Sequence, residues 1–124
     1  MKLLLDTHAF LWWRSNDRRL GDHARSAIGG ADLVFVSAAT AWEAAIKSAL
    51  GRLTYPDTIE AGVEASGFSE LPITVAHAER AGRLPTHHRD PFDRMLVAQA
   101  QAEGLTVVTG DPKIRRYDVH LLWD

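Results

Sequence analysis

A short run of leucines near the start of the chain, Leu3–Leu5, constrains the fold more than any other feature. The run has no polar alternation, which is typical of a strand buried on both faces of a parallel sheet. It ends at Asp6, and an amphipathic helix pattern begins within a few residues. Asp6 is therefore expected at the carboxyl edge of a central strand, where open α/β sheets bind ligands. Its carboxylate could instead simply cap the helix.

Length and composition bound the class of protein. A chain of 124 residues, 46% hydrophobic and 24% charged, is expected to form a single domain over residues 1–124. The absence of cysteine excludes disulfides and thiolate metal sites and favours a cytoplasmic protein. No signal sequence or membrane span is predicted. A formal net charge of −2 argues against a generally basic nucleic-acid surface, so nucleic acid would need a local basic patch or a bound cation.

Buried strands and amphipathic helices are expected to alternate along the chain. Strands are predicted over residues 3–5, 33–36, 71–75, 105–109 and 119–123. Helices are predicted over residues 9–13, 22–28, 38–50, 57–66, 76–84 and 90–104. This alternation predicts an α/β fold, a three-layer α/β/α sandwich with a mainly parallel central sheet and right-handed crossovers.

Four acidic residues are expected near one edge of that sheet. Asp6 and Asp111 follow buried strands, Glu43 lies early in the strongest predicted helix, and Asp93 lies in the first turn of a later one. Two carboxylates about 5 Å apart repel by roughly 3 kcal/mol at an effective dielectric constant of about 20. Such a cluster therefore needs a compensating cation, and oxygen ligands alone suit Mg²⁺ or Mn²⁺ better than zinc.

Several of these residues also have a structural interpretation. The spacing of Thr40 and Glu43 matches a capping box, and Glu43 could pair with Lys47 one helical turn later. Asp90 stands three residues before Asp93, so it could cap that helix or reach a metal ion through water. The sequence leaves both interpretations open.

Four segments carry a further pattern. They are Leu5–His8, Trp42–Lys47 with the trailing Leu50–Leu53, Asp90–Ala100 and Val108–Asp111. They are spread over nearly the whole chain, and in this order they resemble the PIN-domain nucleases, most closely the VapC-type toxins of type II toxin–antitoxin systems. Any one segment alone would be a weak signal, whereas the set is specific.

The resemblance implies a metal-dependent endoribonuclease that acts as the toxin of a toxin–antitoxin pair. It implies an acidic quartet that is both catalytic and metal-binding, formed by Asp6, Glu43, Asp93 and Asp111. Thr109 and Asp90 are the supporting residues. The implied cofactor is Mg²⁺ or Mn²⁺, and water attack on the phosphodiester would leave a 5′-phosphate and a 3′-hydroxyl. The implied partners are RNA, a VapB-type antitoxin and a second copy of the chain in a homodimer, with no membrane.

The roles of the basic and aromatic residues are less specific than those of the four acids. The candidate RNA contacts are Lys47, Arg89, Arg94 and Lys113. His87 and His88 suggest a metal site, but adjacent side chains diverge and no third soft ligand is near, so contact with phosphate is favoured instead. The tryptophans are expected as core or interface anchors rather than platforms for base stacking: Trp12, Trp13, Trp42 and Trp123.

Two other classes of function are alternatives to a nuclease. Phosphoacceptor receivers and acid phosphatases also place an aspartate after the first strand, but they need a second aspartate close by, and here Thr7 and His8 follow Asp6. A catalytically silent PIN-like module would use its acidic pocket only to bind a protein partner. The presence of all four acids weighs against that alternative.

Overall fold

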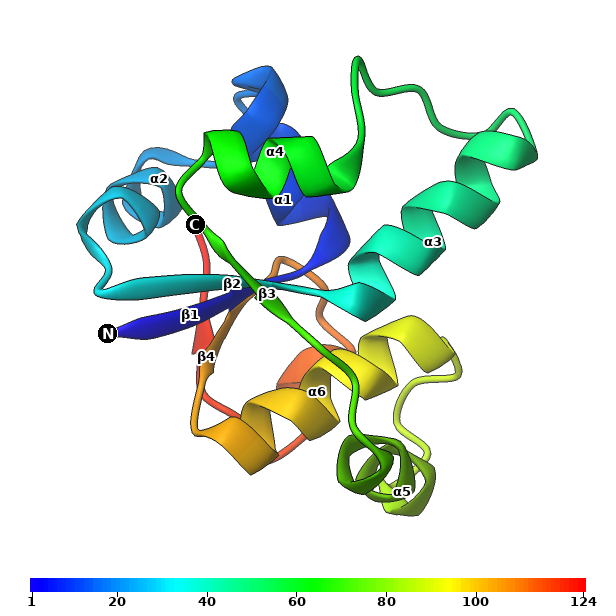
Figure 1. Cartoon of the computed structure of the whole chain (residues 1–124). Coiled ribbons are helices and arrows are strands. Elements are labelled where there is room, and N and C mark those ends of the chain that lie inside the picture. The colour runs from blue at the N-terminus through cyan, green and yellow to red at the C-terminus, as the bar shows by residue number, and fades with distance from the viewer.

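The central element of the computed structural model, which describes all 124 residues, is a five-stranded sheet in the order β3-β2-β1-β4-β5 (Figure 1). Every pair of neighbouring strands is parallel. The strands are β1 Lys2–Leu5, β2 Leu33–Ser37, β3 Ser69–Leu71, β4 Thr106–Val108 and β5 Leu121–Leu122. The predicted α/β fold with a mainly parallel sheet is therefore confirmed, with β1 at its centre.

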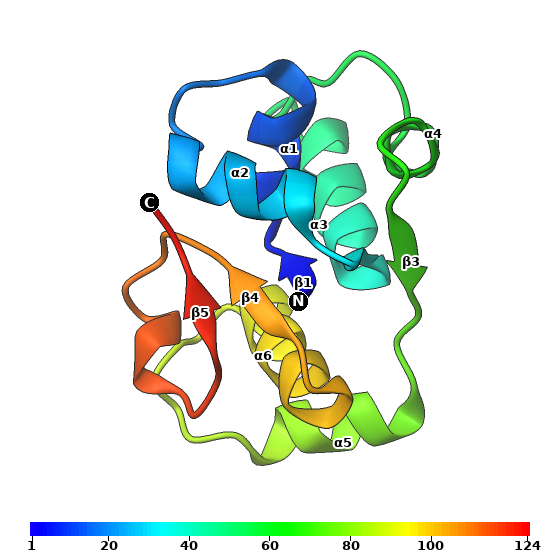
Figure 2. The same ribbon diagram turned by 90° about the vertical axis from the view of Figure 1, so that its left-hand side faces the viewer.

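Helices cover both faces of the sheet. They are α1 Thr7–Ser15, α2 Asp22–Gly30, α3 Ala38–Ala49, α4 Ile59–Ala65, α5 Val75–Arg83 and α6 Pro91–Glu103, with one 3-10 turn, Ile114–Arg116. Helices α1, α2 and α4 lie on one face, and α5 and α6 lie on the other (Figures 1 and 2). Helix α3 starts at the carboxyl edge of the sheet and extends away from it (Figure 1). None of these helices is long and apolar enough to cross a bilayer.

The leucine run of β1 divides its side chains between two hydrophobic cores. Leu3 and Leu5 pack in the same cluster as Phe10 of α1, on one face of the sheet. Leu4 points to the other face and packs in a cluster with Leu96 of α6. All three leucines are fully buried. The absence of polar alternation in this strand thus reflects burial on both of its faces.

The predicted strand over 71–75 is displaced toward the N-terminus. The structure places β3 at Ser69–Leu71, where it pairs with β2. Pro72 has no N–H to donate to the ladder, and the strand ends before it. The next residues begin α5 instead, because Thr74 forms a capping box with His77.

Helix α4 begins at Ile59, two residues after the start of the predicted range of 57–66. Its cap is Thr58, whose hydroxyl accepts a hydrogen bond from Ala61 N at 3.0 Å. Asp57, the first residue of the predicted range, instead lies 3.4 Å from the guanidinium of Arg14. Asp57 and Thr58 both favour N-cap positions, so composition alone could not choose between them.

We expect Leu4→Ala to lower the free energy of unfolding by about 2–5 kcal/mol, because it leaves a cavity in a core that cannot collapse around the central strand. Urea unfolding followed by circular dichroism measures the loss. The matched control is Leu33→Ala on β2, where the side chain is 40% exposed and the expected loss is about 1 kcal/mol or less. Equal losses at the two positions would contradict the central placement of β1.

Candidate functional site

The four predicted acids meet at the carboxyl edge of the sheet. Asp6 directly follows β1, Asp111 lies in the loop after β4, Glu43 is in α3, and Asp93 is in the first turn of α6. They line one pocket with a volume of about 460 Å³. Its other lining residues are Thr7, His8, Trp12, Lys47, His88, Asp90, Gly110 and Trp123. The arrangement follows from parallel strands, whose carboxyl ends share one edge.

Asp6 has both of the roles that the sequence left open. Its carboxylate caps α1 by accepting a hydrogen bond from Ala9 N at 2.8 Å. The same side chain lines the pocket and is only 6% exposed. Burial raises the pKa of Asp6 above its usual value, and a hydrogen bond from the hydroxyl of Thr109 opposes that rise. The cap thus fixes the direction in which the carboxylate enters the pocket.

Glu43 is held by hydrogen bonds to both of its carboxylate oxygens. Oε1 accepts from the hydroxyl of Thr7 at 2.5 Å, and Oε2 accepts from the ammonium of Lys47 at 2.6 Å. The predicted pairing with Lys47 is confirmed, and this hydrogen bond raises the pKa of the lysine. The capping-box interpretation is wrong, because Ser37 caps α3 and Thr40 lies within the helix.

Asp90 and Asp93 occupy the start of α6. Asp90 is the helix cap, accepting from Phe92 N at 2.8 Å and from Asp93 N at 3.3 Å, so its predicted capping role is confirmed. Burial raises the pKa of Asp93 to about 7, and the neighbouring carboxylates of Asp90 and Asp6 add to the rise. His88 acts in the opposite direction. The pocket without a metal ion therefore disfavours the charged form of Asp93, as it does that of Asp6.

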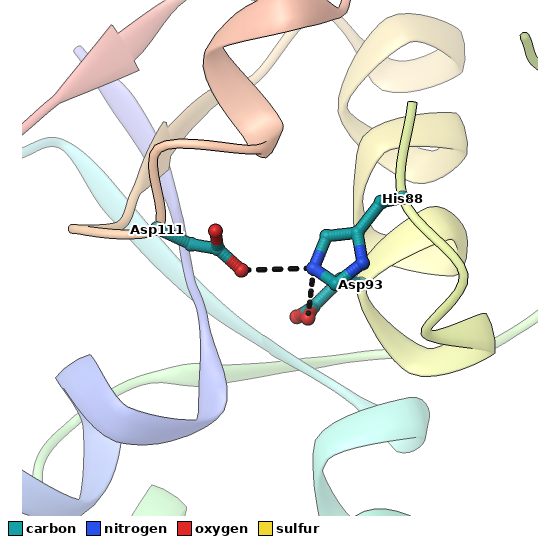
Figure 3. Close-up of side chains that lie close together, drawn as sticks. All are labelled: His88, Asp93 and Asp111. Carbon is teal, nitrogen blue, oxygen red and sulfur yellow. Dashed lines mark hydrogen bonds and ion pairs between the residues drawn. The ribbon is translucent and has the colours of Figure 1, made fainter. Parts of the chain in front are cut away.

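His88 lies between two of the acids (Figure 3). Its Nε2 is 2.8 Å from Oδ2 of Asp111 and 3.1 Å from Oδ2 of Asp93. Sequence reasoning did not place this residue in the pocket, because the direction of a loop side chain has no periodic signal. On its other side Asp111 is held by the loop itself, with Oδ1 accepting from Lys113 N at 2.9 Å and Thr109 Oγ1 accepting from Asp111 N at 3.1 Å.

The predicted basic contacts have different surroundings. The guanidinium of Arg94 donates to the backbone oxygens of Pro85 at 2.9 Å and Ala81 at 2.7 Å, so it ties α6 to the end of α5. Arg89 and Lys113 are exposed; Arg89 stands between two pocket residues in sequence, and Lys113 follows the pocket residue Asp111 by two positions. Arg94 therefore has a structural role here, and Arg89 and Lys113 have side chains available to a ligand.

Two of the four tryptophans take part in the pocket. Trp12 and Trp123 pack against the core and also line the pocket, with ring centroids 6.0 Å apart. Gly110 is required beneath this pair, since a Cβ there would lie 2.6 Å from the indole of Trp123. Trp42 is not part of the core: it is 63% exposed and touches Phe92 edge-on, which leaves the predicted interface role open.

A hollow of about 570 Å³ lies away from the acids, near the start of β4. Its lining includes only one carboxylate, Asp118, beside Arg80 and His120. A single acid offers a weak site for a divalent cation. Size therefore does not identify the functional site here, whereas the chemistry of the lining does.

The donor set of the acidic pocket fits a hard divalent cation. Carboxylate oxygens are the ligands that Mg²⁺ and Mn²⁺ prefer. Burial, with a smaller contribution from neighbouring carboxylates, raises the pKa of both Asp6 and Asp93, so a bound cation would stabilise their charged forms. Potential ligand atoms of His88, Asp93 and Asp111 all lie within 4.8 Å of one another.

The chain belongs to the PIN domain family, whose model matches residues 3–120. Among characterised relatives it is similar to Ribonuclease VapC22 of Mycobacterium tuberculosis. The two are 32% identical over 118 residues, which cover 93% of this chain and 91% of that protein. Membership of the predicted family is therefore confirmed.

Solved structures show the same fold over essentially the whole chain. One is VapBC2 from Rickettsia felis bound to a DNA fragment from its promoter, with a TM-score of 0.72, 16% identity and full coverage of both chains. Another is the sarcin–ricin loop cleaving toxin VapC20 of Mycobacterium tuberculosis, with a TM-score of 0.67 and 12% identity. That match covers 98% of this chain and 99% of the other. At these identities the likeness concerns the fold.

We expect Asp93→Asn to change how the stability of the metal-free protein depends on pH. The folded protein holds the Asp93 proton more tightly than the unfolded chain does, because its pKa is raised from 3.8 to about 7. The free energy of unfolding of the wild type should therefore fall, relative to that of the variant, as the pH rises from about 4 to about 7. Repulsion and burial suggest a relative change of about 1–3 kcal/mol after solvent screening.

Urea unfolding in EDTA at several pH values measures this difference. The control is Asp22→Asn, since the side chain of Asp22 is 96% exposed and should give a difference that does not vary with pH. If the free energies of unfolding of the wild type and Asp93→Asn differed by the same amount at pH 4 and pH 8, the raised pKa of Asp93 would be contradicted.

Proposed function

We propose that this chain is a metal-dependent endoribonuclease that acts as the toxin of a toxin–antitoxin pair. The observation that carries the proposal is the meeting of four carboxylates in one pocket at the carboxyl edge of the sheet, Asp6, Glu43, Asp93 and Asp111. The relationship to Ribonuclease VapC22 supports RNA as the substrate. The likeness to VapBC complexes supports a protein antitoxin as the partner.

We assign the same four acids as the residues that hold Mg²⁺ or Mn²⁺. When bound, such a cation makes a water molecule more acidic and offsets negative charge on the phosphate oxygens. The pocket supplies the oxygen ligands that this chemistry needs. Asp90 supports the set by fixing the start of α6, and Thr109 supports it through the loop that carries Asp111.

The contribution of the protein itself is to hold the acids before the substrate arrives. Asp6 is fixed by the N-terminus of α1, and Glu43 is fixed by Thr7 and Lys47. Fixed groups need not reorganise as charge develops on the phosphate. With water as the nucleophile, the products carry a 5′-phosphate and a 3′-hydroxyl, and no 2′-hydroxyl takes part.

Substrate and partner would meet the same face of the protein. The exposed side chains of Arg89 and Lys113 flank the pocket in sequence, and we assign them to the RNA backbone together with Lys47, which lines the pocket. A basic side chain of an antitoxin can pair with the carboxylates and take the place of the cation. A homodimer is part of the same proposal.

We expect the purified protein to cleave single-stranded RNA in the presence of Mg²⁺ or Mn²⁺ and to stop in EDTA. Asp6→Asn and Asp93→Asn should each reduce the rate by about 100-fold or more, since each removes a charged ligand. The matched control is Glu79→Gln, which changes an exposed acid of α5 outside the pocket and should leave the rate unchanged. Gel assays with end-group analysis of the products measure both.

Two results would contradict this mechanism. One is cleavage that continues undiminished in EDTA. The other is a product with a 2′,3′-cyclic phosphate, which requires attack by the 2′-hydroxyl instead of water. If the wild type binds the cation but cleaves no RNA, the silent binding module becomes the better description.

We expect expression of the chain to arrest growth and co-expression of a cognate antitoxin to restore it. The reading frames adjacent to its gene are the candidates to test, and the restoring protein should co-purify with the chain. The Asp93→Asn variant serves as the control, because it should be harmless when expressed alone. Growth arrest that no adjacent frame relieves, with no complex formed, would remove the antitoxin from the proposal.

A further inference from the structure

His88 is set in the loop between α5 and α6, with a side chain that is only 10% exposed. The loop is anchored from outside the pocket. His88 N donates to the hydroxyl of Tyr117 at 2.9 Å, and that hydroxyl donates to the backbone oxygen of Pro85 at 2.9 Å. The direction of the His88 ring is therefore determined by its own loop and not only by the acids that it meets.

The hydrogen bond to the inner nitrogen of the ring determines where its proton lies. Nδ1 of His88 accepts from Asp90 N at 3.2 Å. A backbone N–H can only donate, so Nδ1 carries no hydrogen, and the hydrogen of a neutral ring is on Nε2. The backbone N–H of Asp90 is held in this direction, because the side chain of Asp90 caps α6.

The outer nitrogen meets two carboxylates from different parts of the fold. Nε2 donates to Asp111, which lies in the loop after β4, and it also contacts Asp93 in the first turn of α6 (Figure 3). One N–H thus faces both acids at 2.8 and 3.1 Å. No element of secondary structure joins these two acids directly, and the His88 ring is a polar partner that both of them share.

The same geometry argues against a direct bond from His88 to a metal ion. A neutral imidazole that coordinates through Nε2 carries its hydrogen on Nδ1. Nδ1 lies 3.2 Å from Asp90 N, so that hydrogen would point at the Asp90 N–H. Two hydrogen-bond donors would then face each other with no acceptor between them. Proximity to Asp93 and Asp111 makes His88 look like a ligand, but its hydrogen bonds are those of a donor.

We propose that His88 is a positioning residue of the metal site: its Nε2–H holds the carboxylates of Asp111 and Asp93 in place, and the ring does not bind the metal ion. This inference rests on the proposed metal site. Hydrogen bonds to the ligands of a metal typically change its affinity by about 10–100-fold. His88 therefore sets how tightly the acids bind the cation without being one of its ligands.

The test compares Mn²⁺ affinity, measured by calorimetry, in matched variants of the whole chain. His88→Leu removes the N–H donor and should weaken Mn²⁺ binding by about 10–100-fold. His88→Gln keeps an N–H donor at a similar reach and should retain most of the affinity. His23→Leu is the control, since His23 is an exposed residue of α2 that does not line the pocket. It should bind Mn²⁺ like the wild type.

A second comparison separates a positioning residue from a ligand. Loss of an imidazole ligand would weaken Co²⁺ binding more than Mg²⁺ binding, because Co²⁺ favours nitrogen donors. Loss of a positioning residue should weaken both by the same factor. Nitrogen-15 NMR of the wild type adds a direct measurement, in which the His88 hydrogen should stay on Nε2 when Mg²⁺ is added.

The outcomes distinguish this inference from the proposed function. A wild type that binds neither Mg²⁺ nor Mn²⁺ would overturn the metal site itself. A wild type that binds them while His88→Leu binds equally well would overturn only the role of His88. A shift of the hydrogen to Nδ1 on addition of Mg²⁺, or a loss confined to Co²⁺, would make His88 a ligand. Melting curves in EDTA identify any variant that fails to fold.

Discussion

Burial of β1 on both faces is the constraint on which the rest of the structure depends. Its three leucines supply both hydrophobic cores at once, so helices must cover each side of the sheet. That requirement places β1 in the middle of the sheet with β2 and β4 as its neighbours. It also places the residue after the strand, Asp6, at the centre of the carboxyl edge. The position of the site is therefore a consequence of the packing of the core.

Electrostatic repulsion and local hydrogen bonding act against each other at that edge. Burial and neighbouring carboxylates raise the pKa of Asp93, which is the cost of gathering acids in one pocket. Neutral hydrogen-bond donors stabilise the charged forms of other acids in the pocket: the N–H of Ala9 at the start of α1 donates to Asp6, and the hydroxyl of Thr7 donates to Glu43. Ordinary helix caps thus also serve as supports for acids that face the pocket.

Much of the fold and the acidic quartet could be predicted from the sequence, because both follow from regular patterns. The two-sided burial of Leu3–Leu5 and the positions of the acids after strands or early in helices need only local periodicity. The prediction of a strand over 71–75 was wrong in its position, because Pro72 ends the strand and the capping box at Thr74 begins α5. His88 was named as a possible metal ligand and set aside, because the sequence does not show that Asp93 and Asp111 lie beside it or that Tyr117, distant in sequence, anchors its loop.

The ion pair between Lys47 and Glu43 bears on whether the protein folds before it binds a cation. Lys47 brings a positive charge into the pocket, and the charges of Asp90 and Asp93 also act on it. The pocket thus contains one internal counter-charge, which offsets part of the repulsion among its acids before any cation binds. Under the proposed function, folding would precede cation binding, and the supply of the cation would then determine when the protein becomes active.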